Sequence, residues 1–165
     1  MPRTPPDPAD KAFRHAIRLL RIKARSTAEL RERLAAHPPH AVEHALRRLV
    51  EARLLDDDAL ARDLAERDLA QGRSRRMTAA RLRTRGLAPP DADPPGAASP
   101  SQTRSDAALA LAAARQVAGR LPASLAPEAR WRRLLGALAR LGHEPDAAHD
   151  ATRAVLGNPP CPEAD

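Results

Sequence analysis

Hydrophobic residues near the start of the chain recur every three or four positions, which is the spacing of one face of an α-helix. They predict a helix over about 8–24, whose buried face is formed by Phe13, Ile17, Leu20 and Ala24. One residue further on, the same spacing produces a basic stripe formed by Arg14, Arg18, Arg21 and Arg25. The helix is therefore expected to be amphipathic, with cations beside its buried face.

A capping box marks the start of the second predicted helix. Ser26 is followed three residues later by Glu29, so each side chain can bond to the backbone N–H of the other. Leu30 then faces inward, and the prolines at 38–39 stop the helix. A third helix is predicted over about 40–53 from its apolar spacing.

Acidic residues and glycines mark the next two helices. The aspartates at 56–58 predict the start of a fourth helix, because carboxylates accept hydrogen bonds from the free N–H groups of a first turn and favour the helix dipole. Gly72 and Ser74 mark a break, after which a fifth helix is predicted over about 75–85. Gly86 suits the left-handed position that follows a helix.

A proline-rich stretch separates these helices from the last part of the chain. Residues 89–101 hold five prolines with small polar residues, a composition that predicts a linker. Three further helices are predicted over about 106–120, 127–141 and 145–156, and glycines follow the last two of them.

The predicted helices form a repeating pattern around Leu34, Leu82 and Leu138. We expect three tandem three-helix repeats, with the third helix of the middle repeat replaced by the Pro-rich linker. The expected parts are a disordered tail at 1–9, repeat 1 at 10–56, repeat 2 with two clear helices at 57–88, the linker at 89–104, repeat 3 at 105–157 and a disordered tail at 158–165.

Composition supports an all-α fold. The 165 residues include one Phe, one Trp and no Tyr, and β-branched residues are few, so a sheet protein is disfavoured. Alanine, leucine and arginine dominate, and all three favour helices. Of the 28 cationic residues, only Lys11 and Lys23 are lysines, and the net charge is +7. This excess suggests an anionic partner such as nucleic acid or a nucleoprotein, although a GC-rich genome would also enrich arginine.

Other classes of protein are disfavoured by the same inventory. Cys161 is the single cysteine, so neither a disulfide framework nor a thiolate metal cluster is expected. The N-terminal residues lack the apolar segment of a signal peptide. The most apolar run, 107–114, is too short to span a bilayer. We therefore expect a cytoplasmic protein that does not enter a membrane.

Four segments in order resemble hallmarks of the RecX family, whose members regulate the bacterial recombinase RecA. Residues 25–30, R-S-T-A-E-L, resemble the family's R-S-x-x-E-L element. The run L-R-R-L at 46–49, followed by L-L-D-D at 54–57, resembles its second hallmark. Residues 81–87 and 138–143 are similar to its basic turns that contain glycine. The residues that carry the resemblance are Arg25, Ser26, Glu29, Leu30, Leu55, Asp56, Asp57, Gly86 and Gly142.

The resemblance implies an elongated, curved molecule of three repeats that binds RecA and inserts into the groove of its filament on single-stranded DNA. It also implies suppression of ATP hydrolysis, strand exchange and coprotease activity, without catalysis by the protein itself. The chain departs from the family pattern at several positions. Arg53 and Pro38 stand where glycine is expected, and Leu60 and His143 stand where phenylalanine is usual.

Arginine clusters are the candidate contacts to RecA or to DNA phosphates, because guanidinium groups pair bidentately with carboxylates and phosphates. The candidates are Arg47, Arg48, Arg73, Arg75, Arg76, Arg81, Arg83, Arg85, Arg130, Arg132, Arg133 and Arg140. The alternative for each of them is a solvated helix face. Without aromatic platforms, DNA contact would be mainly electrostatic and would depend on salt.

Three other patterns could indicate metal binding, catalysis or base stacking, but each has a simpler structural explanation. His40 and His44 lie in an H-x-x-E-H sequence that can bind zinc, but no third ligand is evident, so no metal site is expected. The aspartates at 56–58 could bind magnesium, and Ser26 could be a nucleophile, but helix capping explains both. Trp131 could stack on a base, yet its spacing favours the core.

These observations favour a RecX-like regulator of RecA in DNA repair and the SOS response. We expect no catalytic residues and no cofactor, and a monomer whose partners are RecA and its filament, with weak direct DNA binding as a further expectation. The alternative is a basic helical module that binds nucleic acid independently of RecA.

Overall fold

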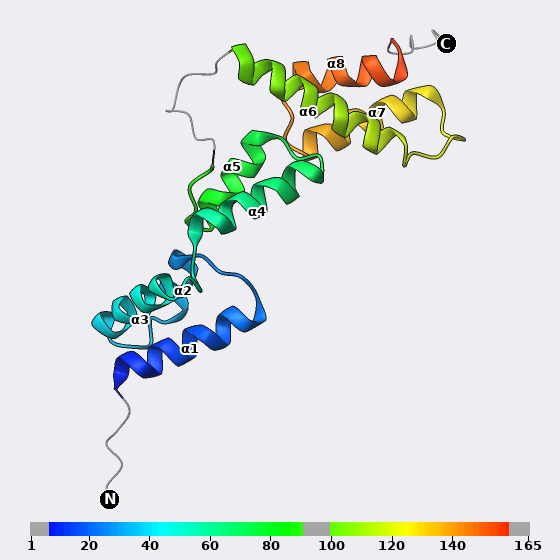
Figure 1. Ribbon diagram of the computed structural model, residues 1–165. Helices are drawn as coiled ribbons and strands as arrows, with labels where there is room; N and C mark the ends of the chain where they lie inside the picture. Colours follow the sequence, from blue (N-terminus) through cyan, green and yellow to red (C-terminus); the bar gives the residue numbers. More distant parts are fainter. Residues whose placement is uncertain (1–6, 91–99, 159–165) are drawn as a thin grey trace, which may run out of the picture. The chain divides into compact units, whose positions relative to one another are not determined.

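The computed structural model describes residues 7–90 and 100–158, with the backbone alone described at 100–105. Eight α-helices and no strands are found in these ranges, so the predicted all-α fold is confirmed. The helices are α1 (Pro8–Ile22), α2 (Thr27–Arg33), α3 (Pro39–Glu51), α4 (Asp57–Ala70), α5 (Arg75–Thr84), α6 (Pro100–Ala118), α7 (Pro127–Arg140) and α8 (Pro145–Leu156) (Figure 1). Among the described residues, no helix is long and apolar enough to cross a membrane.

The chain divides into two compact units. Unit 1 contains residues 1–64 and 81–90, and unit 2 contains residues 65–80 and 91–165. Each unit therefore takes one part of α4 and one part of α5. The predicted second repeat, 57–88, is shared between the units, and the boundaries of the three repeats stay a prediction.

In unit 1, α1 packs against α3, and α2 also contacts α3. The main core cluster is formed by Ala16, Leu30, Leu34, Val42, Leu46, Leu49 and Leu55. A second cluster joins α1 to α3 through four buried alanines, Ala9, Ala12, Ala41 and Ala45, with Phe13 packed against them. Small side chains at these positions let the two helices approach closely.

The predicted buried face of α1 is partly wrong. The fully buried positions are Ala12 and Ala16, whereas Phe13 is half-buried and Ala24 is exposed. The reason is the close α1–α3 contact, which centres on alanines and leaves the larger side chains at its border. Ala24 also lies beyond the end of α1 at Ile22.

In unit 2, α6, α7 and α8 pack on one another (Figure 1). Their core is formed by Ala110, Ala113, Ala114, Leu134, Leu138, Ala148 and Ala151. Pro127 and Pro145 occupy the first positions of α7 and α8, where their missing N–H groups have no helical partner to lose. Both helices begin where the sequence predicted.

Helix α6 begins at Pro100, earlier than the predicted start near 106. Residues 100–104 are thus helical although they were assigned to the linker, because proline fits the first turn of a helix and the next residues can continue it. The remaining linker prediction falls mainly on residues 91–99, which lie outside the described residues. The predicted tails at 1–9 and 158–165 likewise lie mostly outside them, but Pro8 and Ala9 belong to α1, so the tail prediction is wrong at these two residues.

Candidate functional site

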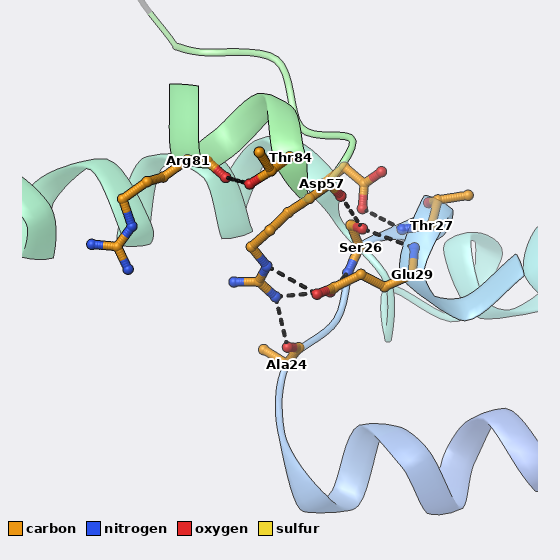
Figure 2. Close-up of polar contacts among 8 residues, drawn as sticks. Ala24, Ser26, Thr27, Glu29, Asp57, Arg81 and Thr84 are labelled. Carbon is orange, nitrogen blue, oxygen red and sulfur yellow. Dashed lines mark hydrogen bonds and ion pairs between the residues drawn. The ribbon is translucent and has the colours of Figure 1, made fainter. Parts of the chain in front are cut away.

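Ser26 joins two segments of unit 1 that are far apart in the sequence. Its Oγ accepts a hydrogen bond from the Glu29 N–H at 3.1 Å and donates one to the Arg85 carbonyl at 2.5 Å. The Glu29 carboxylate in turn accepts from the Ser26 N–H at 2.9 Å, which completes the predicted capping box. Figure 2 shows Ser26 and Glu29 at this junction. Ser26 is fully buried, and its hydroxyl serves the fold.

Arg85 closes the same junction from the other side. Its Nε and Nη2 donate to the two carboxylate oxygens of Glu29 at 3.1 and 2.8 Å, and Nη2 also donates to the Ala24 carbonyl at 3.1 Å. This bidentate hydrogen bond is the main cause that lowers the pKa of Glu29 below its ordinary value of 4.5. Arg85, predicted as a contact residue, is thus paired inside the molecule.

Gly86 follows Arg85 in the left-handed conformation that the sequence predicted, with φ of +70°. A Cβ at this position would lie 2.4 Å from the Cβ of Ala28, closer than two carbons can approach. We call Ser26, Glu29, Arg85 and Gly86 the first clasp. It fixes the start of α2 to the end of α5, both within unit 1.

Helix capping, expected for the aspartates at 56–58 at the start of α4, is found for Asp56, whereas Asp57 caps a different helix. Asp56 accepts from the Ala59 N–H at 2.8 Å, so it caps the N-terminus of α4. Asp57 accepts from the Thr27 N–H at 2.9 Å and thereby caps α2 (Figure 2). Two of the three aspartates therefore have structural partners.

Unit 2 contains a second clasp, formed by Ser74, Met77 and Gly142. Ser74 Oγ accepts from the Met77 N–H at 3.1 Å and donates to the Gly142 carbonyl at 2.7 Å. Gly142 has φ of +85°, and a Cβ there would lie 2.7 Å from the Cβ of Met77. The arrangement matches the first clasp: a serine at the start of one helix holds the turn after another.

Sequence reasoning assigned Ser74 only to a helix break and did not foresee its contact with Gly142. The signal was present, because each serine precedes a short helix and each partner turn ends in glycine. His143 was likewise noted only as a departure from phenylalanine. It is buried, and its Nε2 lies 2.9 Å from the Gly72 carbonyl, so it links the turn after α7 to the turn after α4.

Several predicted contact arginines of the second unit pair with acidic side chains. Arg73 Nη1 lies 3.0 Å from Asp68 Oδ1, and Arg76 Nε lies 3.0 Å from Glu144 Oε1. Arg75 Nε lies 3.6 Å from Asp106 Oδ1. Arg76 is nevertheless largely exposed, so its ion pair is weakly held.

In unit 1, Arg48 contacts Asp10 at 2.7 Å, and its guanidinium lies 4.2 Å from the centre of the Phe13 ring. Arg47 and Arg83 are exposed, and so is Arg81, whose carbonyl accepts from Thr84 Oγ1 at 2.8 Å (Figure 2).

The remaining predicted cations lie on α7. Arg132, Arg133 and Arg140 are exposed, while Arg130 is half-buried and its Nε has no hydrogen-bond partner among the described residues. The structure therefore divides the candidates by exposure. The exposed ones are Arg47, Arg76, Arg81, Arg83, Arg132, Arg133 and Arg140. Their role as contacts stays a prediction.

The basic stripe of α1 is also exposed, although it was not included among the candidate contacts. Arg14, Arg18 and Arg21 occupy the face of α1 opposite the buried alanines. Arg14 Nε donates to the Asp10 carbonyl at 3.3 Å. The sequence signal for this stripe is its spacing of three and four residues.

The His40–His44 pair and Trp131 lie in different surroundings. His40 and His44 are exposed, and no group of three metal-binding side chains occurs among the described residues. Trp131 is buried with 9% exposure, and its ring centre lies 6.5 Å from that of His149. It packs in the core of unit 2, as its spacing favoured.

Comparisons with known proteins give a likeness in structure. No family model matches the sequence, and no curated protein matches it. The crystal structure of RecX from Lactobacillus salivarius superimposes with a TM-score of 0.63 at 12% identity, covering 90% of this chain and 97% of that one. A second crystal structure, of regulatory protein RecX, gives a TM-score of 0.58 at 18% identity, covering 86% of this chain and 71% of that one. The chain thus has the fold of RecX proteins, and the RecX resemblance found in its sequence is confirmed at the level of that fold.

Proposed function

We propose that this chain is a RecX-type regulatory protein that binds RecA and the RecA filament on single-stranded DNA. It inhibits recombinase, ATPase and coprotease activities in DNA repair and the SOS response. The observation that supports this proposal best is the structural likeness to RecX over 90% of the chain. The protein acts as a cytoplasmic monomer by occupying a surface, without catalysis of its own.

The roles of the motif residues support the same proposal. Ser26, Glu29 and Gly86 belong to the first clasp, and Gly142 belongs to the second. Residues that resemble family hallmarks therefore build the junctions of a fold that is similar to RecX. This agreement between motif and structure is independent of overall sequence identity.

Exposed arginines are the proposed contacts to the filament. Arg132 and Arg133 lie next to each other on α7, and Arg47 and Arg83 are exposed in unit 1. Their guanidinium groups can pair with phosphates or with carboxylates of the recombinase. Arg85 is excluded from this set because it pairs with Glu29.

The direct test is RecA-driven ATP hydrolysis on single-stranded DNA, with and without this protein. We expect hydrolysis to fall as the protein is added at low salt. A variant with Arg132→Glu and Arg133→Glu should inhibit less, because it loses two proposed contacts to the filament. Both residues are exposed, so the variant should still fold. Unchanged hydrolysis at several-fold excess of wild-type protein over RecA would reject inhibition.

A second function is supported by the exposed basic face of α1. Arg14, Arg18 and Arg21 could hold phosphates of nucleic acid without RecA. This function predicts tight binding to bare single-stranded DNA, measured by fluorescence anisotropy, with a steep decrease as salt rises. Weak binding to bare DNA beside strong binding to the filament would dismiss it.

A further inference from the structure

Most residues of the R-S-T-A-E-L motif at 25–30 have a structural role that can be named. Ser26 and Glu29 form the first clasp, and Leu30 is fully buried in the core of unit 1. Arg25 is different. Its Nε is buried but has no hydrogen-bond partner among the described residues. Buried polar atoms are almost always paired, so an unpaired guanidinium nitrogen requires an explanation.

The L-L-D-D motif at 54–57 also leaves one residue without a structural role. Leu55 is buried, Asp56 caps α4, and Asp57 accepts from the Thr27 N–H. Leu54 is 52% exposed, which makes it one of the few large apolar side chains in solvent among the described residues. Core packing and helix capping therefore explain three of the four positions, and Leu54 has neither role.

The backbone before Leu54 adopts a disfavoured conformation. Arg53 has φ of +54°, the one positive φ of a residue other than glycine in the described part of the chain. Side chains with a Cβ rarely adopt this region, and such strain persists where the surrounding structure holds it. Here it fixes the turn from which Leu54 projects, at the position where glycine was expected.

Arg25 and Leu54 line the same surface pocket in unit 1. The pocket has a volume of about 210 Å³, and its other walls are formed by Leu20, Ala24, Leu55, Asp56 and Leu60. Five of its seven lining residues are apolar. It is smaller than the sites of drug-sized ligands, which measure about 300–1,000 Å³, and so suits one side chain.

We infer that this pocket docks a peptide segment of a protein partner, which inserts a leucine-sized side chain beside a carboxylate that pairs with Arg25. The leucine walls would bury the aliphatic group. The partner's carboxylate pairs with the positive charge of the Arg25 guanidinium. Asp56 also lines the pocket, where its Oδ1 accepts from the Ala59 N–H, and Arg25 is the cation among the lining residues.

The identity of the partner rests on the proposed function, under which the segment belongs to RecA. The chemistry of the pocket does not depend on that identity. Two experiments therefore separate the pocket from the proposed function, one with a small probe and one with the filament.

The first experiment titrates the full-length protein with N-acetyl-leucine, which joins the aliphatic group and the carboxylate in one small molecule. Methyl NMR resonances of Leu20, Leu54 and Leu60 should shift and saturate at millimolar concentration, as expected for so few atoms. N-acetyl-leucinamide, which lacks the carboxylate, should bind roughly tenfold more weakly. An Arg25→Gln variant should remove that difference.

Two results would overturn the inference. One is the absence of saturable shifts at these three leucines up to tens of millimolar. The other is equal binding of the acid and the amide to wild-type protein. Spectra of Arg25→Gln and Leu54→Ser without probe would verify that both variants fold, which is expected because Leu54 is half in solvent.

The second experiment measures binding to the RecA filament on single-stranded DNA. Leu54→Ser and Arg25→Gln should each weaken binding by about tenfold. Matched controls are Val50→Ser, which is 53% exposed on α3 outside the pocket, and Arg33→Gln, which is exposed on α2 outside the pocket. If wild-type protein binds and all four variants bind equally well, the pocket inference is wrong and the proposed function stands. If wild-type protein does not bind, the proposed function fails, and the NMR titration alone decides on the pocket.

Discussion

At the scale of single residues, the two clasps depend on a serine hydroxyl that accepts one hydrogen bond and donates another. Ser26 Oγ serves the Glu29 N–H and the Arg85 carbonyl, and Ser74 Oγ serves the Met77 N–H and the Gly142 carbonyl. Both serines are buried, so water cannot replace the missing bonds if the hydroxyl is removed.

Ser26→Ala should therefore destabilise the protein by about 1–3 kcal/mol, the range for loss of an N-cap with buried groups left unpaired. The measurement is the midpoint of urea unfolding. Ser124→Ala is the control, since Ser124 is exposed between α6 and α7. Equal midpoints for the two variants would contradict a structural role for the Ser26 hydroxyl.

Gly86→Ala should destabilise the protein for two reasons, while Gly157→Ala should do so for one. Both glycines have positive φ, of +70° and +87°, a conformation that costs about 1–3 kcal/mol for a residue with a Cβ. At Gly86 the new Cβ would also meet Ala28 at 2.4 Å, whereas nothing lies within 4 Å at Gly157. The difference between their unfolding free energies should be about 1–3 kcal/mol, the cost of overpacking. Equal unfolding free energies for the two variants would mean that Ala28 and the residues around it can move to accommodate the new Cβ at no cost.

At the scale of elements, two histidines connect α1 with the turn before α3. His15 Nδ1 lies 3.1 Å from His37 Nε2, and their ring centres are 5.4 Å apart. Burial lowers the pKa of His15 below its ordinary value of 6.5, and the nearby His37 and Arg18 lower it further. The neutral ring is therefore the form that suits the folded state.

This pair predicts a stability that depends on pH. Above pH 6.5, His15 is neutral in both the folded and the unfolded chain, so its contribution is fully present. As pH falls below 6.5, the unfolded chain binds a proton more readily than the folded one, and stability decreases. His15→Gln should flatten the unfolding midpoint between about pH 7 and 5.

The control is Ser124→Ala, which changes an exposed residue without an ionisable side chain and should keep the pH dependence of wild-type protein. A wild-type midpoint that does not change over this range would refute the assigned role of His15.

At the scale of the whole molecule, the net charge is +7, and its arginines are of two kinds. Some form ion pairs within the fold, and others have side chains exposed to solvent. Arg85, Arg73 and Arg48 hold acidic partners within the fold. Arg132 and Arg133 are exposed on α7. Exposed arginines such as Arg132 and Arg133 can bind phosphates and release their counterions without first breaking an internal ion pair.

Replacing Arg132 and Arg133 by glutamine should weaken binding to the filament and reduce the salt slope of binding by about two, since each phosphate contact contributes about one. Binding of labelled protein to the filament at several salt concentrations measures both quantities. The control removes the same charge from paired positions, with Arg31→Gln and Arg153→Gln, whose partners are Glu43 and Asp150. Identical slopes for the two double variants would exclude the α7 pair as a contact.

The sequence by itself determined the all-helical fold class and most helix ends. Caps, prolines and glycines mark helix ends through interactions between residues only a few positions apart in the sequence. Ser26 with Glu29, Pro127 and Gly86 were located in this way. The same local signals identified Asp56 as the cap of α4, whereas Asp57 caps α2 through a tertiary contact.

Only the tertiary structure decided which distant groups meet. The bidentate pairing of Arg85 with Glu29, and the contact of Ser74 with Gly142, join residues more than fifty positions apart. The pocket that brings Arg25 beside Leu54 is of the same kind. Local spacing carries no information about such pairs, because packing of separate helices sets which side chains are buried, paired or left open to a partner.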